Sequence, residues 1–132
     1  MATTLTAATL SLDLNLKQGE GATISLTTVD RGGAVITNPA GYTVRAQIRR
    51  TSTGPVLFEW NTAPSSAQGS ATLAYDPGPP AVSTTTLVHT GAQSALWTFR
   101  LAQWDCFILA PGQEPACLAA GVVRVSPAIT HQ

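Results

Sequence analysis

Alternation of apolar and polar residues, rather than any helical periodicity, runs through most of this chain. In residues 10–16 every second residue is a leucine, and the residues between the leucines are polar. Successive side chains of a strand point to opposite faces of a sheet, so this period of two predicts a strand with one buried face. Residues 22–27 and 42–49 repeat the pattern, and the denser apolar run at residues 56–60 is typical of a more enclosed strand. The chain is therefore expected to fold into sheets.

The last third of the chain continues the pattern. Trp97, Phe99 and Leu101 share one face of a predicted strand, and residues 121–125 alternate again after a Pro-Gly turn. Helical spacing is almost absent, and residues 92–96 support one helical turn at most. Strand starts recur at roughly 8- to 15-residue intervals, which is typical of an all-β sandwich or barrel built from antiparallel strands.

The length of 132 residues suits one hydrophobic core. We expect a single β-sandwich domain over residues 10–132, preceded by an extended N-terminal arm at residues 1–9. The arm is small and polar, with Leu5 as its one anchor and candidate partner contact. Its Thr-rich composition leaves two alternatives open: the arm has no fixed structure in the free monomer, or it adds a strand to a neighbouring subunit.

Charge is scarce and balanced. Seven basic and seven acidic residues give a net charge of zero, and the charged content of 11% is less than half the roughly 25% that is usual. Such a chain lacks the basic footprint of a nucleic-acid-binding protein. Arg45 and Arg49 fall on one face of a predicted strand, which is either a solvated face or an anion site. Both arginines are also candidate partner contacts. A surface with so few charges favours docking in an assembly.

No apolar stretch reaches the ~18 residues that would predict a membrane span, and the N-terminus lacks the pattern of a signal peptide. We therefore expect synthesis in the cytoplasm. Cys106 and Cys117 flank the final turn, where they form either a disulfide or two free thiols. Matching the apolar faces of the two strands leaves these cysteines out of direct register, so a bulge near Asp105 or a pair of free thiols is expected.

The residues predict no catalytic, cofactor-binding or metal site. His89 stands alone, and no Gly-x-Ser-x-Gly elbow accompanies it, so a small hydrolase centred on His89 is the weakest alternative. Trp60 and Trp97 are expected in the core. Trp104 falls on a face turned away from Phe99, where it is a candidate partner contact or the platform of a carbohydrate-binding module.

A series of short landmarks runs along residues 10–130 in a fixed order. They are Leu12–Leu16 followed by Gln18-Gly19, Asp30-Arg31-Gly32-Gly33, Gly41-Tyr42, Gln47-Ile48-Arg49, Gly69, Trp97–Leu101 and Gly121–Thr130. The order of these landmarks resembles small immunoglobulin-like β-sandwich modules of tailed-phage particles. The N-terminal domain of phage baseplate upper proteins is similar, as are stand-alone capsid decoration or cement proteins.

The resemblance implies an immunoglobulin-like sandwich of about 7–9 strands and a structural, non-enzymatic role in a virion. A capsid decoration protein that docks on the major capsid protein lattice is the leading hypothesis, because no stalk or receptor-binding domain follows the sandwich. A tail or baseplate adaptor is the alternative, and a carbohydrate-binding module is a further one. The expected partners are the major capsid protein or other virion proteins, with homo-oligomers on the particle. No nucleic acid, membrane, small-molecule substrate or cofactor is expected.

Overall fold

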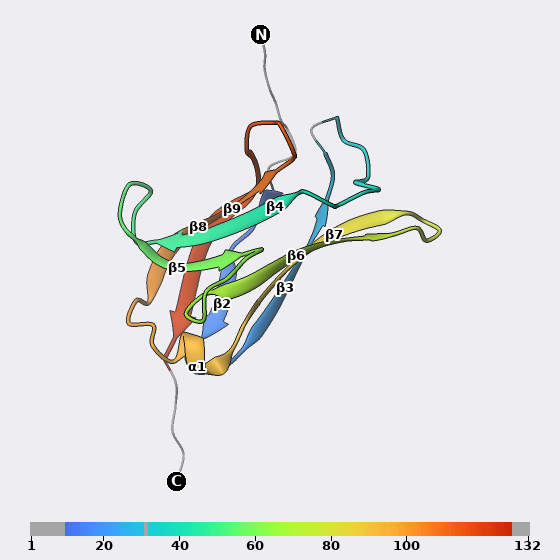
Figure 1. Ribbon diagram of the computed structural model, residues 1–132. Helices are drawn as coiled ribbons and strands as arrows, with labels where there is room; N and C mark the ends of the chain where they lie inside the picture. Colours follow the sequence, from blue (N-terminus) through green and yellow to red (C-terminus); the bar gives the residue numbers. More distant parts are fainter. Residues whose placement is uncertain (1–9, 31, 128–132) are drawn as a thin grey trace.

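The computed structural model describes residues 10–30 and 32–127. This part of the chain forms nine strands and one short helix (Figure 1). The elements are β1 (Leu10–Ser11), β2 (Leu14–Lys17), β3 (Ala22–Thr28), β4 (Thr43–Arg49), β5 (Val56–Asn61), β6 (Gly69–Asp76), β7 (Val82–His89), α1 (Gly91–Ser94), β8 (Leu101–Leu109) and β9 (Ala116–Ser126).

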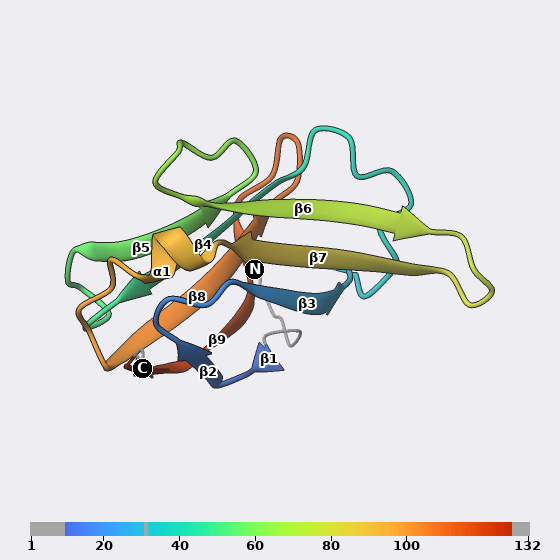
Figure 2. The same ribbon diagram turned by 90° about the horizontal axis from the view of Figure 1, so that it is seen from below.

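The strands form two facing layers that join along one side. The front layer contains β1 and β2, both paired with β9, followed by β8, β4 and β5. The back layer is β6, β7 and β3, as the view from below shows (Figure 2). A short parallel pairing at Trp60 and Gly69 connects β5 to β6, so the layers are one continuous, curled sheet. The opposite side, between β2 and β3, has no such connection in the described residues.

This strand order confirms the all-β, immunoglobulin-like prediction. In an immunoglobulin sandwich, strands D, E and B form one sheet and strands C, F and G the other, with C′ added beside C in variable-type domains. The order β6-β7-β3 and the order β9-β8-β4-β5 reproduce these two sheets. The expectation of purely antiparallel pairing needs correction, because β1 and β2 pair with β9 in parallel and β5 pairs with β6 in parallel.

The space between the layers is filled by inward-facing apolar side chains. Val44, Ala46 and Ile48 of β4 are buried, as their alternation predicts. An aromatic cluster spans both layers: Phe58 and Trp60 come from β5, His89 comes from β7, and Trp97 follows α1. The ring centroids that are in contact within this cluster lie 4.8 to 5.9 Å apart. The expected core positions of Trp60 and Trp97 are confirmed.

The strand predicted for residues 10–16 is interrupted. β1 ends at Ser11 and β2 begins at Leu14, because the backbone at Leu12 passes directly over β9. A Cβ atom on Gly121 would lie 2.0 Å from the Leu12 carbonyl oxygen, so only glycine fits at this crossing. Asp13 secures the break, since its Oδ1 accepts a hydrogen bond of 3.0 Å from the backbone N–H of Val122.

The strand predicted for residues 97–101 is also displaced. Trp97 and Phe99 are buried, but they lie in the connection that precedes β8, which begins only at Leu101. Leu101 then faces outward and is 59% exposed, because the inward positions of β8 are the even-numbered residues from Ala102 to Ile108. The single helical turn expected near residues 92–96 is confirmed as α1, with a capping box between Thr90 and Gln93.

The close approach at Gly121 yields a stability prediction. We expect Gly121→Ala to lower the free energy of unfolding by about 1–3 kcal/mol, because the added methyl group must push the Leu12 backbone away from β9. Gly32→Ala is the matched control: its nearest contact would be a side-chain oxygen of Asp30 at 3.4 Å, so a change within about 0.5 kcal/mol is expected. Chemical denaturation measures both, and equal stability of the two variants would contradict the prediction.

Candidate functional site

The outward face of the front layer presents a row of polar side chains on β4. Arg45, Gln47 and Arg49 alternate with the buried residues of this strand, so all three point away from the core. The two arginines therefore share one face, as predicted. Arg45 is exposed and Arg49 is half-buried, which leaves Arg45 as the more accessible of the two charges.

Arg49 is held by a hydrogen-bonded network that crosses the sheet. Its Nη1 donates to the carbonyl oxygen of Gly54 at 2.6 Å, and its Nη2 donates to Gln47 Oε1 at 2.6 Å. Gln47 in turn donates to Glu59 on β5 at 2.7 Å, and Asn61 donates to the second oxygen of Glu59 at 2.7 Å. Charge-assisted bonds of this kind fix side-chain geometry. The face is thus preorganised rather than a set of mobile surface chains.

A recess of about 370 Å³ lies beside this network, over β4, β8 and β9. Asp105 is half-buried at its wall, opposite Gln47 in the strand pairing. Burial raises the pKa of Asp105, while the positive charges of Arg49 and Arg45 partly offset this rise. Small residues on β9 contribute to the hollow, which is lined by Gln47, Arg49, Ser52, Gln103, Trp104, Asp105, Ala120, Gly121 and Val122.

Trp104 does not occupy the surface position that the sequence predicted for it. The side chain points into the core and is 3% exposed, because β8 buries its even-numbered residues. Its indole Nε1 donates a hydrogen bond of 2.8 Å to the Leu12 carbonyl oxygen. Trp104 therefore supports the crossing of the first strand over β9, and it provides no open platform for stacking a sugar ring.

Exposed apolar residues frame the outward face of β8. Leu101 and Leu109 stand at its two ends, and Phe107 lies half-buried between them. All three share a face with Asp105, since they alternate along the strand. The sequence pattern missed this apolar contribution because it assigned Leu101 to the buried stripe of Trp97 and Phe99. A more exposed apolar side chain, Leu96, follows α1 and is 80% exposed.

The two cysteines are not joined by a disulfide. Cys106 pairs with Ala119 and Phe107 pairs with Cys117, with an irregularity in register between Cys106 and Phe107. The irregularity lies next to Asp105, where a bulge was one of the two alternatives, and the second alternative was a pair of thiols. Burial raises the pKa of the Cys106 thiol to about 12, so this group is an unreactive core side chain.

His89 lies inside the aromatic cluster and is 2% exposed. Its ring packs against Trp97 at 4.8 Å and against Trp60 at 5.7 Å between centroids. Burial lowers the pKa of His89, and the backbone of Glu20 opposes this shift by a smaller amount. The histidine is therefore neutral in the folded protein near pH 7, and it does not line the recess over β4, β8 and β9.

Within residues 10–30 and 32–127, no group of three histidine, cysteine or acidic side chains is arranged to hold a metal ion. In the same residues, no helix has the length and apolar character that crossing a membrane requires. Leu5, the remaining candidate contact, and the arm at residues 1–9 lie outside the described residues.

No family model matches this chain, and no curated protein matches it. Among solved structures, the chain is similar to one from a study entitled "Structure-based site-directed photo-crosslinking analyses of multimeric cell-adhesive interactions of VGSC beta subunits". The two share 11% sequence identity with a TM-score of 0.45, over 94% of this chain and 98% of the other. A similarity of this size says nothing about function.

The buried histidine predicts how stability depends on pH. In the unfolded chain His89 binds a proton near its ordinary pKa of 6.5, whereas the folded state resists protonation until a lower pH. Below about pH 6.5 the unfolded state therefore binds more protons than the folded state. As the pH decreases in this range, the free energy of unfolding falls by up to about 1.4 kcal/mol per pH unit. Above pH 6.5 this contribution is fully present.

We expect His89→Phe to remove this part of the pH dependence, because phenylalanine keeps an aromatic ring in the cluster without a titrating group. His131→Gln, which changes the other histidine of the chain, should retain it. Denaturant titrations between pH 7.5 and 5.5 measure the slope for each protein. Parallel curves for the parent chain and His89→Phe would contradict the prediction.

Proposed function

We propose that this protein is a non-enzymatic structural protein of a tailed-bacteriophage particle, and specifically a capsid decoration or cement protein that docks on the major capsid protein lattice. The observation that carries the proposal is the outward face of the front layer. There a fixed polar network around Arg49 lies beside the half-buried Phe107 and the exposed Leu101 and Leu109. Protein interfaces combine such apolar anchors with satisfied polar groups.

Sequence and charge support the same role. The order of landmarks along the chain resembles the sandwich modules of phage particles, and the chain has a net charge of zero. A protein that sits among many copies of itself on a shell benefits from weak mutual repulsion. Specificity then depends on local pairing, for which the exposed Arg45 beside the half-buried Asp105 is the best-placed charged contact.

The carbohydrate-binding alternative depended on an exposed Trp104, and this residue is buried. A tail or baseplate adaptor uses the same chemistry as a capsid protein and differs in copy number, because shells and tails have different symmetries. We therefore keep the tail adaptor as the second candidate, to be separated from the first by counting.

Quantitative mass spectrometry of purified particles tests the location. Hundreds of copies per particle are expected for a decoration protein, against about six to a few dozen for a tail adaptor, because symmetry sets the number of equivalent sites. A copy number in the range expected for a tail adaptor would assign the protein to the tail instead of the capsid. Its absence from mature particles would overturn the virion assignment.

Binding of the purified protein to particles that lack it tests whether the outward face of β4 is the docking surface. We expect Arg45→Glu to weaken occupancy about tenfold, corresponding to a loss of about 1.4 kcal/mol, because it reverses a charge on this face. Arg50→Glu is the matched control: it makes the same change of charge at an exposed residue just beyond β4. Gel densitometry of washed particles measures both variants. Equal occupancy by both would exclude the β4 face as the docking surface.

A further inference from the structure

The back layer ends in a strand edge that the described residues leave open. β3 pairs with β7 along its whole length, from Ala22 opposite His89 to Thr28 opposite Ser83. No other strand of the described chain pairs with β3, which stands last in the sheet order. An open edge presents unpaired backbone N–H and C=O groups, which form a template for another strand.

β3 has none of the usual features that prevent edge pairing. Its sequence contains no proline and no charged residue, and its register with β7 is continuous, without a bulge. The other end of the same sheet is different. There β1 and β2 are only two and four residues long, a break separates them, and Asp13 and Lys17 add charge. One edge is therefore protected and the other is not.

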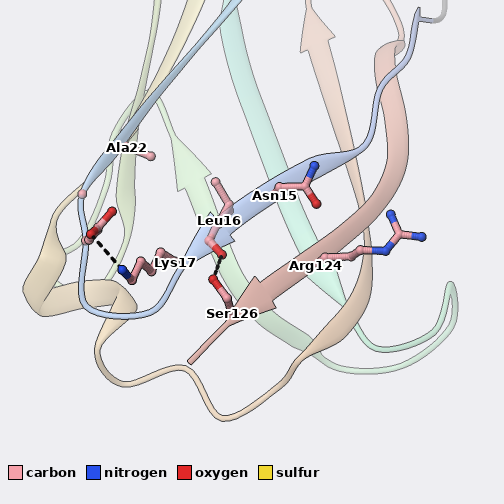
Figure 3. A pocket seen from close by; sticks show the side chains of 8 residues that line it. Asn15, Leu16, Lys17, Ala22, Arg124 and Ser126 are labelled. Carbon is pink, nitrogen blue, oxygen red and sulfur yellow. Dashed lines mark hydrogen bonds and ion pairs between the residues drawn. The ribbon is translucent and has the colours of Figure 1, made fainter. Parts of the chain in front are cut away.

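The open side of the sandwich is also incompletely covered. Leu16 of β2 and Ile24 of β3 pack against the core but are only partly buried. A recess of about 270 Å³ lies between the two layers at this side. Figure 3 shows Leu16 and Ala22 on opposite sides of it, with Arg124 and Ser126 of β9 nearby. A strand added along β3 would cover these apolar groups and satisfy the edge backbone together.

We propose that β3 accepts the N-terminal segment, residues 1–9, of a second copy of this chain. Nine residues precede β1 in the sequence, which is enough to run along the seven residues of β3. The segment is uncharged and rich in threonine, a residue favoured in strands. In an extended conformation Leu5 faces opposite to Thr4 and Thr6, so Leu5 supplies an apolar contact for Ile24 and Leu16.

The direction of the chain favours a second copy over the chain's own segment. β1 begins beside Ala119, near the start of β9, and β2 ends beside Ser126, at the end of β9. β3 starts after the turn that follows β2 and runs back, as Figure 1 shows. To reach the beginning of β3, the chain's own segment would have to reverse its direction before Leu10. A segment from another copy has no such constraint.

The molar mass of the full-length chain in solution, measured by light scattering over a range of concentrations, tests this proposal. We expect masses above the 13.7 kDa of a monomer as concentration rises. Leu5→Asp should abolish the association, while Thr6→Asp, with the same charge on the other face of the segment, should preserve it. A monomer at every concentration, or equal effects of the two variants, would overturn the proposal.

Variants of the acceptor strand provide a second test. Ile24→Lys places a charge on the inward side of the edge and should abolish association, whereas Ser25→Lys, on the exposed side, should not. Near-ultraviolet circular dichroism of the tryptophans checks that Ile24→Lys remains folded. If Ile24→Lys does not fold, the comparison of Leu5→Asp with Thr6→Asp still tests the proposal.

Disulfide trapping identifies which copy donates the segment. In a Cys117→Ser background, chains with Thr4→Cys or Thr6→Cys are mixed with chains of different mass that carry Ser25→Cys. Cross-links that join the two masses are expected. When both cysteines are placed in one chain, a cross-link within the monomer and none between chains would refute donation by a second copy. Purified chains suffice, so the outcome is independent of the phage assignment.

Discussion

Burial of one aromatic cluster between the two layers holds this sandwich together. Phe58 and Trp60 enter from the front layer, His89 enters from the back layer, and Trp97 closes the end of the cluster from the connection after α1. Burying each large ring contributes roughly 1.5–3 kcal/mol relative to leaving it in water. The cluster also keeps His89 neutral, so the packing that joins the layers makes stability sensitive to acid.

With the interior filled in this way, the features that remain for function lie on the outside. The front layer offers a preorganised face around Arg49, with apolar side chains along β8. The open side offers a strand edge on β3. These two surfaces do not overlap, so one molecule can use a sheet face toward one partner and a strand edge toward another. A repeating assembly needs two such separate contacts on each copy.

Local pattern was sufficient for much of the fold because alternation reports directly which face of a strand is buried. It placed Val44, Ala46 and Ile48 in the core, and it predicted that the strands would leave Cys106 and Cys117 out of register. It was wrong for Trp104 and Leu101, because the phase of β8 depends on where the strand begins. Trp97 and Phe99 alternate like strand residues, yet they reach the core from an irregular connection.

The sequence by itself determined the class of this protein, because alternating strands and Gly- and Pro-rich turns leave an all-β sandwich as the consistent outcome. Only the tertiary structure decided which side chains face outward together and which edge remains open. Those properties follow from pairings between distant segments, such as β2 with β9 and β3 with β7. No local pattern encodes them, because a strand's own sequence does not specify its neighbour.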